Sequence, residues 1–479
     1  MPRRTKIVAT LGPATQDRQT LKQVLDAGVN VVRLNFSHGT HQDDIDRAVM
    51  VRELAAELGV YVGILGDLQG PKIRVSTFKN GPIQLNIGDK FELDANLGKG
   101  QGCQEKVGID YKKLPEDVTS GDILLLDDGR IELRVEKISG SKIVSEVIHG
   151  GLLYDSKGLN RKGGGLSASA ISDKDLEDIK VAAKIGIDYL AVSFAREAKD
   201  IELARKLLTE AGSDGGIIAK IERAEALDNI DEIIEASNAI MIARGDLGVE
   251  IGDAQLPAVQ KNLIKKARKK DKVVITATQM MESMITNSIP TRAEVFDVAN
   301  AVIDGTDAVM LSSETAMGDH PVEAVEAMSR ICEGSEGQSP ITSKTSNYSI
   351  ENKKVDRAIA MACMLTADNL NPVAIAAITE SGSTALWMSR INHSVPIFAL
   401  TTHTGTLRKI TLYRGVYPAR IKTIDTNHAT VNKDAVNVLT KLKVAKDNDL
   451  VIITKGDLAG IEGGTNAIKV VKVGHLVED

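Results

Sequence analysis

Eight short apolar runs, rich in valine and isoleucine, recur along the chain and constrain its fold more than any other feature. They are KIVATLG, VVRLNF, VGILGDL, YLAVSF, GIIAKIE, AIMIARGD, VVITATQ and AVMLSSET. Most are separated by amphipathic stretches such as DLEDIKVAAKIG and AVQKNLIKKARKK, in which apolar residues recur every three or four positions. Buried parallel strands read as continuous apolar runs, and helices connect them. Eight such units predict an α/β chain built on a (β/α)8 TIM barrel.

Two further segments interrupt or follow the predicted barrel. Residues 71–169 contain short alternating strands with Gly-Asp and Asp-Gly turns, as in GPIQLNIGDKFEL, which predicts an inserted, mostly β lid domain. Because this insertion follows the third strand, we expect it over the mouth of the barrel. CEGSEGQSPITSKTSNYSIENKK predicts a linker, and PVAIAAITE, PIFALTT and DLVIITKG predict a smaller α/β domain after it. The predicted domains are 1–70 with 170–340, then 71–169, then 341–479.

The composition narrows the class of partner. The chain has 479 residues, 43% of them hydrophobic, and a formal net charge of −6, which gives no general attraction to nucleic acid or anionic lipid. We expect the basic run KKARKK to be a solvated helix face. Cys103, Cys332 and Cys363 lack disulfide-framework or zinc-site spacing, and no run approaches the roughly 18 apolar residues of a membrane span. We therefore expect a cytoplasmic protein with small-molecule partners, and neither nucleic acid nor membrane among them.

Polar residues end most of the predicted strands. Active sites of such barrels form where the strands end, so we expect these side chains to share one site. They are Arg33, Asn35 and Ser37 after the second run, Asp67 after the third, Lys220 and Glu222 at the fifth, Arg244 and Asp246 at the sixth, Thr278 at the seventh, and Ser312 and Glu314 at the eighth.

Lys220 and Glu222 are two residues apart, so both should point into the barrel from one strand. A self-contained ion pair is the alternative, and it weakens when Asp246 joins from the neighbouring strand. Two carboxylates beside a lysine suit Mg²⁺, which takes few protein oxygens and completes its shell with water and substrate phosphate. With Arg33 and Arg74 as further cations, the pattern predicts a phosphorylated or carboxylated substrate.

The glycines of RGDLGVEIG leave two interpretations open. Gly245 and Gly248 could serve only a tight strand-to-helix turn, or they could let backbone N–H groups approach an anion. Neither a P-loop nor a GxGxxG fingerprint occurs in the expected setting, so a nucleotide-binding fold of those types is not predicted.

Several of these motifs together resemble the pyruvate kinase family. VVRLNFSHG, GDLQGPKIR, AKIE, IARGDLGVE, ITATQMMESM, PTRAEVFDVANAV and DAVMLSSETAMGDHP match its motifs in order and spacing. The resemblance covers nearly the whole chain. It implies phosphoryl transfer from phosphoenolpyruvate to ADP, giving pyruvate and ATP as the last step of glycolysis, with Mg²⁺, which Mn²⁺ may replace, usually K⁺, and a homotetramer.

The resemblance also assigns roles to residues. It implies that Glu222 and Asp246 hold Mg²⁺, that Lys220 balances charge on the transferred phosphoryl group and the enolate, and that Arg33 grips the phosphate. Gly245, Asp246 and Thr278 match the positions that hold the substrate carboxylate, and Arg74 and Lys157 match nucleotide-phosphate contacts on the lid. Thr278, or a water held by Thr278, Ser312 and Glu314, would protonate the enolate.

One residue departs from the family's common pattern. GPKIR carries Lys72 where an acidic residue is usual, and the acidic form accompanies a K⁺ requirement. Asn35, Ser37, Asp67 and the Leu68 carbonyl match K⁺-ligand positions. An ammonium near them would repel a second cation, so we expect K⁺ to be dispensable.

The C-terminal segment TESGSTA resembles the effector loop of regulated members. Its candidate phosphate contacts are Thr379, Ser381, Gly382, Ser383 and Thr384, at the start of a predicted helix. The last loop, TKGDLAGIEGGTNAIKV, lacks the tryptophan and arginine of forms that bind fructose bisphosphate. We therefore expect a sugar monophosphate or nucleotide monophosphate as allosteric activator, with a purely structural helix cap as the alternative.

Two other functions fit parts of the pattern. A lyase or aldolase barrel acting on phosphoenolpyruvate or pyruvate would use the same metal and arginine set, but it would not need a lid carrying nucleotide-reaching cations. A catalytically dead phosphometabolite sensor would not need Lys220, Glu222, Asp246 and Thr278.

Overall fold

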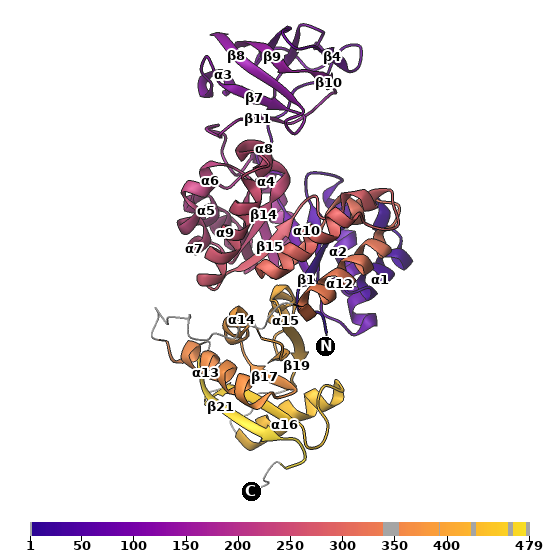
Figure 1. Ribbon diagram of the computed structural model, residues 1–479, viewed down its shortest axis with the longest axis vertical. Helices are drawn as coiled ribbons and strands as arrows, with labels where there is room; N and C mark the ends of the chain where they lie inside the picture. The colour runs from indigo at the N-terminus through magenta and orange to yellow at the C-terminus, as the bar shows by residue number, and fades with distance from the viewer. Residues whose placement is uncertain (1, 339–353, 392, 423–427, 458–462, 476–479) are drawn as a thin grey trace.

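The computed structural model describes residues 2–338, 354–391, 393–422, 428–457 and 463–475. Three bodies lie along its long axis, with the barrel between the lid and the C-terminal domain (Figure 1). All eight predicted barrel strands are present, and they close into one parallel barrel in the order β1-β16-β15-β14-β13-β12-β3-β2. Their bounds are β1 Lys6–Thr10, β2 Val31–Asn35, β3 Gly63–Asp67, β12 Tyr189–Val192, β13 Gly216–Ile221, β14 Ala239–Ala243, β15 Val273–Ala277 and β16 Ala308–Leu311.

Helices surround the barrel and bury an apolar layer against its strands. Three of them begin with reciprocal capping boxes, Thr40 with Asp43, Ser172 with Asp175 and Thr291 with Glu294, which satisfy backbone N–H groups at the first turn. The helices are α1 Arg18–Asp26, α2 His41–Leu58, α4 Asp173–Ile185, α5 Ala198–Glu210, α6 Glu225–Asp228, α7 Ile230–Ala236, α8 Arg244–Ile251, α9 Leu256–Lys269, α10 Arg292–Asp304, α11 Ser313–Ala316 and α12 Pro321–Gln338.

The inserted segment is mostly β, as the sequence predicts. It forms a six-stranded sheet in the order β11-β7-β8-β9-β5-β6 and a two-stranded sheet of β10 and β4, around its own apolar core. The elements are β4 Ile83–Leu85, β5 Lys90–Asp94, β6 Lys106–Gly108, α3 Leu114–Asp117, β7 Ile123–Leu126, β8 Ile131–Ser139, β9 Lys142–His149, β10 Gly151–Leu153 and β11 Leu159–Arg161. The insertion follows β3, so the lid lies beyond the ends of the strands that carry the polar residues (Figure 1).

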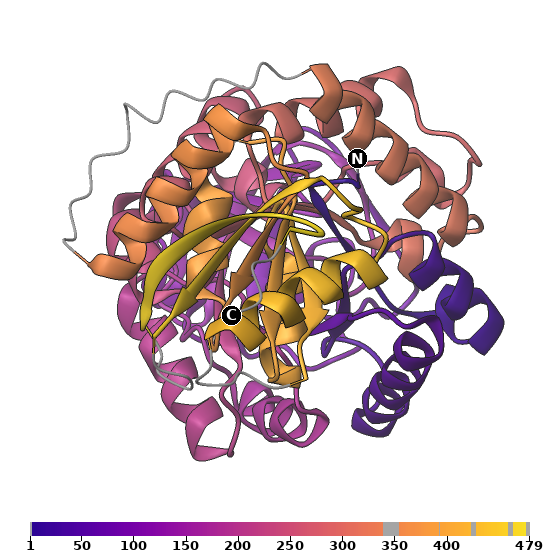
Figure 2. The same cartoon turned by 90° about the horizontal axis from the view of Figure 1, so that it is seen from below.

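The C-terminal domain is a five-stranded sheet in the order β19-β18-β17-β20-β21, and only β21 runs antiparallel to its neighbour. Seen from below, this sheet lies across the ring of barrel helices (Figure 2). Its elements are α13 Val355–Leu370, β17 Ala374–Ile378, α14 Ser383–Arg390, β18 Ile397–Thr401, α15 Thr404–Lys409, β19 Val416–Arg420, α16 His428–Lys441, β20 Leu450–Gly456 and β21 Thr465–Lys472. The edge strands β19 and β21 are absent from the sequence prediction.

The predicted linker is wrong over its first seven residues. Helix α12 continues to Gln338, because Glu336 is drawn into a buried contact with the N-terminus of the barrel. Its carboxylate accepts hydrogen bonds from Thr5 Oγ1 at 2.6 Å and from Arg4 N at 2.8 Å. These tertiary contacts outweigh the weak helix propensity of glycine and serine. Residues 339–353 of that segment lie outside the described residues.

The C-terminal domain closes the end of the barrel opposite the lid. Leu412 is fully buried in the apolar cluster that fills the barrel interior, where it joins Val8, Leu65 and Ile275. Tyr189 Oη donates to the Lys409 carbonyl at 2.7 Å, which links the start of β12 to α15. No helix in the described part of the chain is both long enough and apolar enough to cross a bilayer.

Candidate active site

Lys220 is the centre of the polar cluster at the lid end of the barrel. Its Nζ lies 2.9 Å from Glu222 Oε1 and 3.4 Å from Asp67 Oδ1, and it donates to Ser193 Oγ at 2.7 Å. Ile221, between Lys220 and Glu222, is buried among the helix-facing residues of the barrel. The period of two along β13 therefore brings Lys220 and Glu222 together inside the barrel, as the sequence predicts.

Arg33 adds a second cation from β2. Its Nε donates to Asp67 Oδ2 at 2.6 Å and its Nη1 to Thr10 Oγ1 at 3.1 Å. Asn35 pairs with Asp67 in the register of β2 and β3, which is why residues distant in sequence share one site. Asp67 is fully buried and contacts both Arg33 and Lys220, so it holds the two cations close to each other.

Burial and neighbouring charges set the ionisation of this cluster. Burial opposes the charge on Lys220, but Asp67 and Glu222 outweigh it and raise the pKa of the ammonium above its ordinary value. Burial also opposes ionisation of Asp67, and Lys220 with Arg33 nevertheless lowers its pKa. The pKa of Glu222 is raised, first by burial and also by the charge of Asp246, against the attraction of Lys220. Lys220 is therefore a fixed cation at neutral pH.

Glu222 and Asp246 fit a hard divalent cation. Asp246 lies in the first turn of α8, after the strand that neighbours β13, and its charge reaches Glu222. Glu222 Oε2 accepts from Phe194 N at 2.7 Å. Among the described residues, no group of three or more His, Cys, Asp and Glu side chains is arranged to hold a metal. Two carboxylates suit Mg²⁺, which takes its remaining ligands from water and substrate phosphate.

Lys72 contacts Asp246 in the structure. Lys72 belongs to the strap that leaves β3 toward the lid, and its ammonium donates to Asp246 Oδ1 at 3.1 Å. The expected neighbours have other partners. Asn35 Oδ1 accepts from Ser37 N at 3.2 Å, and the Leu68 carbonyl accepts from Ser193 Oγ at 2.8 Å. Lys72 thus contacts a candidate Mg²⁺ ligand.

Thr278 stands at the end of β15 with a φ of 65°, which is a strained conformation for a β-branched residue. Its Oγ1 accepts from Gly245 N at 2.8 Å and donates to the Ala277 carbonyl at 2.7 Å. Gly245 and Thr278 therefore meet, as predicted. The amide of Gly245 points at a side chain of the site, and this favours a role for that glycine beyond a plain turn.

Arg244 holds the strained segment in place, and the sequence analysis gives it no role. It is 7% exposed, and its Nη2 donates to the Thr278 carbonyl at 2.7 Å and the Gln279 carbonyl at 3.1 Å. Its Nη1 lies 2.7 Å from Asp297 Oδ1. Gln279 also has a positive φ, of 53°. The guanidinium thus binds consecutive carbonyls of a turn that would otherwise relax.

Ser312 and Glu314 follow β16 at the same end of the barrel. The Glu314 carboxylate accepts from Ser312 N at 2.7 Å and from Met281 N at 3.2 Å, so it ties the end of β16 to the segment after Thr278. Burial raises the pKa of Glu314. Both of its oxygens serve backbone N–H groups, which makes Glu314 a support for this wall of the site.

The lid brings Arg74 and Lys157 together. Arg74 bridges Gly158 in an antiparallel pair, and its Nη1 donates to the Ser156 carbonyl at 2.9 Å. Lys157 Nζ lies 2.7 Å from Asp127 Oδ1. The two predicted nucleotide contacts are therefore neighbours on one domain.

The predicted effector residues lie in the loop before α14 and in the first turn of that helix, on the C-terminal domain. Gly382 adopts a φ of 87° and donates its N–H to Thr379 Oγ1 at 2.9 Å. Thr384 Oγ1 is 2.8 Å from Thr465 Oγ1, and both residues are buried. Ser381 and Ser383 place their hydroxyls 2.9 Å apart.

Ser193 is a site residue that the sequence analysis omits. It follows β12, and its Oγ contacts Lys220, the Leu68 carbonyl and, at 3.5 Å, Asp67 Oδ1. The rule that selects polar residues at strand ends would have found it in YLAVSF.

Comparison with known proteins identifies the family independently of the site geometry. The family model for the pyruvate kinase barrel domain matches residues 2–325, and that for the pyruvate kinase alpha/beta domain matches residues 357–471. The chain is 55% identical over 475 residues to pyruvate kinase II of Salmonella typhimurium, covering 98% of this chain and 99% of that protein. A pyruvate kinase of Haemophilus influenzae is 53% identical over 458 residues, covering 95% and 96%. A crystal structure of a pyruvate kinase from Cryptosporidium parvum matches with a TM-score of 0.92 at 34% identity, covering 98% of this chain and 96% of that one.

Proposed function

The chain belongs to the pyruvate kinase family, and we propose that it transfers the phosphoryl group of phosphoenolpyruvate to ADP at the lid end of the barrel, giving pyruvate and ATP. The main support for this assignment is that Lys220 contacts Glu222 and Asp67, beside Arg33 and Asp246. Such a site offers cations and metal-binding oxygens without a nucleophile. Phosphoryl transfer needs positioning and charge stabilisation more than covalent chemistry.

Glu222 and Asp246 are proposed to hold Mg²⁺, with Mn²⁺ as a substitute. When bound, the ion would neutralise charge on the transferred phosphoryl group and the enolate. The Arg33 guanidinium grips the phosphate, and its bond to Asp67 keeps its planar donor face in one orientation. Lys220, charged and fixed by two carboxylates, stabilises the negative charge that moves from the phosphate to the enolate oxygen.

Gly245, Asp246 and Thr278 are proposed to orient the substrate carboxylate at the start of α8. The enolate is then protonated at carbon by Thr278, or by a water held among Thr278, Ser312 and Glu314. The hydroxyl of Thr278 already exchanges hydrogen bonds with Gly245 and Ala277, which fixes its rotamer for such a transfer.

Arg74 and Lys157 are proposed to bind the phosphates of ADP when the lid closes. Closure also excludes water, which would otherwise compete with ADP for the phosphoryl group. This lid argues against the lyase alternative, which has no use for a second phosphate site.

We infer that K⁺ is dispensable. The Lys72 ammonium lies beside Asp246, so a permanent positive charge already stands next to the reacting groups. Asn35, Ser37, Asp67 and the Leu68 carbonyl remain the positions where K⁺ would bind. A second positive charge in the same site would be repelled by this ammonium, which disfavours adding the ion.

We further propose that a sugar monophosphate or nucleotide monophosphate activates the enzyme through the loop Thr379, Ser381, Gly382, Ser383 and Thr384. We also propose that the protein is a cytoplasmic homotetramer. Its proposed domains are 1–70 with 170–340, then 71–169, then 341–479. Light scattering would test the tetramer.

Initial rates with phosphoenolpyruvate, ADP and Mg²⁺, coupled to pyruvate detection, test the central proposal. ADP-dependent pyruvate formation is expected. Pyruvate formation that is independent of ADP would instead support a lyase.

A further inference from the structure

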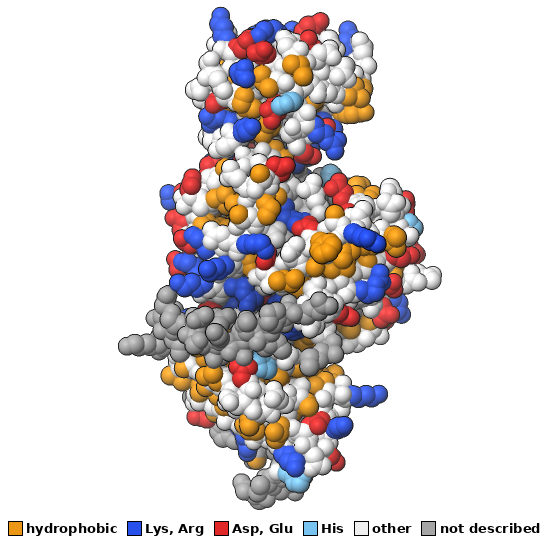
Figure 3. All heavy atoms as spheres, in the orientation of Figure 1, with side chains coloured by type: hydrophobic (Ala, Val, Ile, Leu, Met, Phe, Trp, Pro, Cys, Tyr) orange, Lys and Arg blue, Asp and Glu red, His pale blue; other side chains and the backbone are white. Residues whose placement is uncertain are grey.

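Two segments of chain join the lid to the barrel, and the second of them contains three consecutive glycines. This return strap, residues 160–166, begins in β11 and leads toward α4. The lid is a separate lobe, and the surface is drawn in where it meets the barrel (Figure 3). Gly163, Gly164 and Gly165 adopt φ angles of 81°, 80° and 92°, a region that glycine enters without steric cost. Contacts from outside the return strap must therefore fix its course.

Two side chains from the segment after β13 hold the return strap. Arg223 is 4% exposed, and its Nη1 donates to the Leu166 carbonyl at 2.9 Å. The Glu225 carboxylate accepts a hydrogen bond from the backbone N–H of Gly165. Leu166 is buried in the apolar core of the lid, so the contact with Arg223 reaches the body of that domain.

Glu250 holds the same strap from α8, and β11 lies directly above that helix in Figure 1. Its Oε1 accepts from Asn160 Nδ2 at 3.3 Å, and its backbone carbonyl accepts from Gly163 N at 3.2 Å. Its Oε2 accepts from Ala224 N at 2.8 Å. Glu250 therefore connects the return strap to the segment that carries Arg223 and Glu225.

The side chains that hold the strap follow the two proposed Mg²⁺ ligands closely in sequence. Arg223 and Glu225 come one and three residues after Glu222, and Glu250 comes four residues after Asp246. Asp246 and Glu250 lie about one turn apart on α8, so the helix carries them as one unit. A displacement of the strap is therefore transmitted to both carboxylates over a very short length of backbone.

Phe194 makes a second connection between Arg223 and the proposed metal site. Its backbone N–H donates to Glu222 Oε2 at 2.7 Å, and its φ of 55° is strained for an aromatic residue. The guanidinium carbon of Arg223 lies over the Phe194 ring, 5.5 Å from its centroid, in a cation–π contact. Arg223 thus contacts both the lid and the residue that orients Glu222.

We propose that Arg223, Glu225 and Glu250 form a clasp that sets the position of the lid and couples that position to Glu222 and Asp246. The inference rests on the proposed phosphoryl transfer and deepens it, because the clasp aligns the lid's nucleotide contacts with the proposed metal. The three are positioning residues, since they act through the return strap and the two carboxylates.

Two glycine variants test the clasp from the side of the strap. A Cβ at Gly164 would lie 2.3 Å from Glu225 Oε2, so Gly164→Ala forces that carboxylate away and breaks its contact with Gly165. A Cβ at Gly163 meets no atom within 4 Å, although the φ angle there is nearly the same. Gly163→Ala is therefore a control with matched backbone strain and an intact contact with Glu225.

Arginine variants test the clasp from the side of the barrel, and they cover a folding defect in the glycine variants. Arg223→Met removes the donor to the Leu166 carbonyl. Arg223→Lys keeps the charge and one donor, so it should recover part of the parent behaviour. Arg205→Met is the matched control, because Arg205 also donates to a barrel carbonyl, that of Ala236 at 2.6 Å, at the end of the barrel away from the lid.

The position of the lid can be measured without turnover. Cys103 lies in the lid and is partly exposed, whereas Cys332 and Cys363 are buried. A nitroxide on Cys103 and a second on Lys199→Cys, at a side chain 82% exposed, report the distance between lid and barrel by pulsed electron–electron double resonance. We expect Gly164→Ala and Arg223→Met to broaden the distance distribution of the full-length protein by about twofold.

The same two variants should change binding selectively. We expect KM for ADP to rise by about tenfold, while KM for phosphoenolpyruvate stays within about twofold of the parent value. Because the clasp is coupled to Glu222 and Asp246, the Kd for Mn²⁺ measured by water proton relaxation should rise by about threefold. Gly163→Ala and Arg205→Met should keep the parent values of all three constants.

An unchanged distance distribution in both Gly164→Ala and Arg223→Met would overturn the clasp. Equal broadening in Gly163→Ala or Arg205→Met would also overturn it, because the lid position would then follow general stability. Parent affinity for Mn²⁺ in variants whose lid has moved would refute the coupling to Glu222 and Asp246. If the parent enzyme forms no pyruvate from phosphoenolpyruvate and ADP, the proposed function fails, and the lid distances still decide whether the clasp holds.

Discussion

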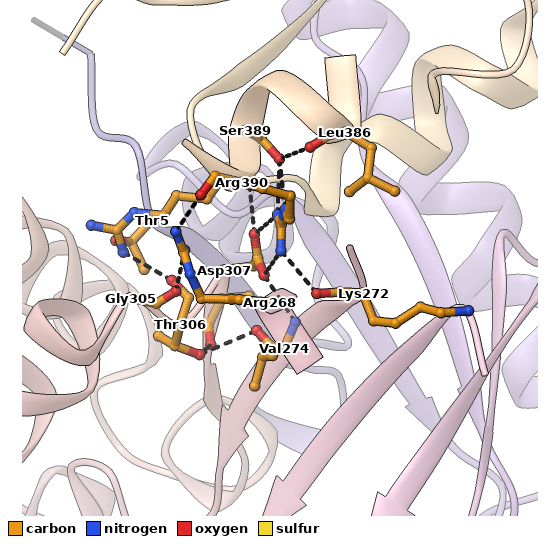
Figure 4. A network of polar contacts seen from close by, with 12 residues as sticks. Thr5, Arg268, Lys272, Val274, Gly305, Thr306, Asp307, Leu386, Ser389 and Arg390 are labelled. Carbon is orange, nitrogen blue, oxygen red and sulfur yellow. Dashed lines mark hydrogen bonds and ion pairs between the residues drawn. The ribbon is translucent and has the colours of Figure 1, made fainter. Parts of the chain in front are cut away.

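Arg390 and Asp307 form an ion pair that is almost completely buried between the C-terminal domain and the barrel. Arg390 is 1% exposed and Asp307 is 0% exposed, and Arg390 Nη1 donates to Asp307 Oδ2 at 2.9 Å. Burial opposes ionisation of Asp307, yet the guanidinium lowers the pKa of that carboxyl. The pair joins α14 to the residue before β16, so it fixes the relative position of the two domains (Figure 4).

Arg390→Met should therefore destabilise the protein, because it leaves the Asp307 carboxylate buried without its partner. Removing one member of a buried pair costs about 3–5 kcal/mol. Urea unfolding followed by Trp387 fluorescence measures the loss in the affected domain. The double variant Arg390→Met with Asp307→Asn should recover much of it. Unchanged stability in the single variant would show that the pair contributes nothing.

Lys220→Met should abolish most turnover with little effect on metal binding. Loss of a cation that stabilises transition-state charge is expected to lower kcat by about 10³-fold, or about 4 kcal/mol. Steady-state kinetics measure kcat, and Mn²⁺ titration by water proton relaxation measures the metal site. Lys199→Met, whose side chain is 82% exposed, is the surface control. A fall in Mn²⁺ affinity that accounts for the whole loss of rate would assign Lys220 to holding the metal ligands.

Lys72 should decide the dependence on a monovalent cation. We expect the parent enzyme to run within about twofold of its K⁺ rate in tetramethylammonium, because its own ammonium contacts Asp246. Lys72→Glu removes that charge, and its rate should rise strongly when K⁺ replaces tetramethylammonium. Rates measured at constant ionic strength separate this effect from screening. A large loss of turnover rate in the parent enzyme without K⁺ would refute the proposal.

Sequence pattern alone predicts the barrel because its strands are buried on both faces and so appear as unbroken apolar runs. The same reasoning misses β19 and β21. β19 contains Pro418 and lies at a sheet edge, and β21 is half exposed, so neither shows the apolar run of a central strand. Lys220 and Glu222 are predictable from the two-residue period of a strand.

Contacts between domains cannot be predicted from local sequence patterns. The approach of Lys72 to Asp246 depends on how the lid strap crosses the mouth of the barrel, and 174 residues separate the two in sequence. Glu336 extends a helix through a glycine- and serine-rich stretch only because Thr5 lies beside it. Neither the Lys72–Asp246 contact nor the Glu336–Thr5 contact can be predicted from local secondary-structure propensity.

Glu250 should make stability depend on pH. Burial raises its pKa from an ordinary 4.5 to about 7, and nearby Glu225 adds to the rise while Arg223 opposes it. The folded state then binds the proton more tightly than the unfolded state, so this contribution is complete below about pH 4.5 and is lost as pH rises toward 7. Glu250→Gln should therefore be stabilised relative to the parent by an amount that grows by on the order of 3 kcal/mol between pH 5 and pH 8.

Glu250 Oε1 accepts from Asn160 at the lid's last strand at 3.3 Å, and Oε2 accepts from Ala224 N at 2.8 Å. Urea midpoints measured across this pH range give the comparison. Glu177→Gln, at a side chain 61% exposed, should show no such trend. A difference between Glu250→Gln and the parent that stays constant with pH would mean that the carboxyl titrates normally.

Arg244 should act as a positioning residue for the strained turn at Thr278. Its guanidinium binds the carbonyls of Thr278 and Gln279, both of which have positive φ angles. Arg244→Lys keeps the charge but loses the planar fork, so the turn should relax and the Thr278 hydroxyl should leave its place beside Gly245. Because the substrate carboxylate is proposed to bind there, we expect kcat/KM for phosphoenolpyruvate to fall by about 10²-fold.

The KM values for the two substrates distinguish a positioning role of Arg244 from a general loss of stability. A disordered turn should raise KM for phosphoenolpyruvate more than KM for ADP, since the nucleotide is proposed to bind the lid. Asp297→Asn is the conservative companion, because it keeps a hydrogen-bond acceptor for Arg244 Nη1, and its effect should be smaller. Equal losses toward both substrates, together with a lower unfolding midpoint, would instead make Arg244 a general stabilising residue. A rise confined to the phosphoenolpyruvate KM supports its role in holding Thr278 where the carboxylate binds.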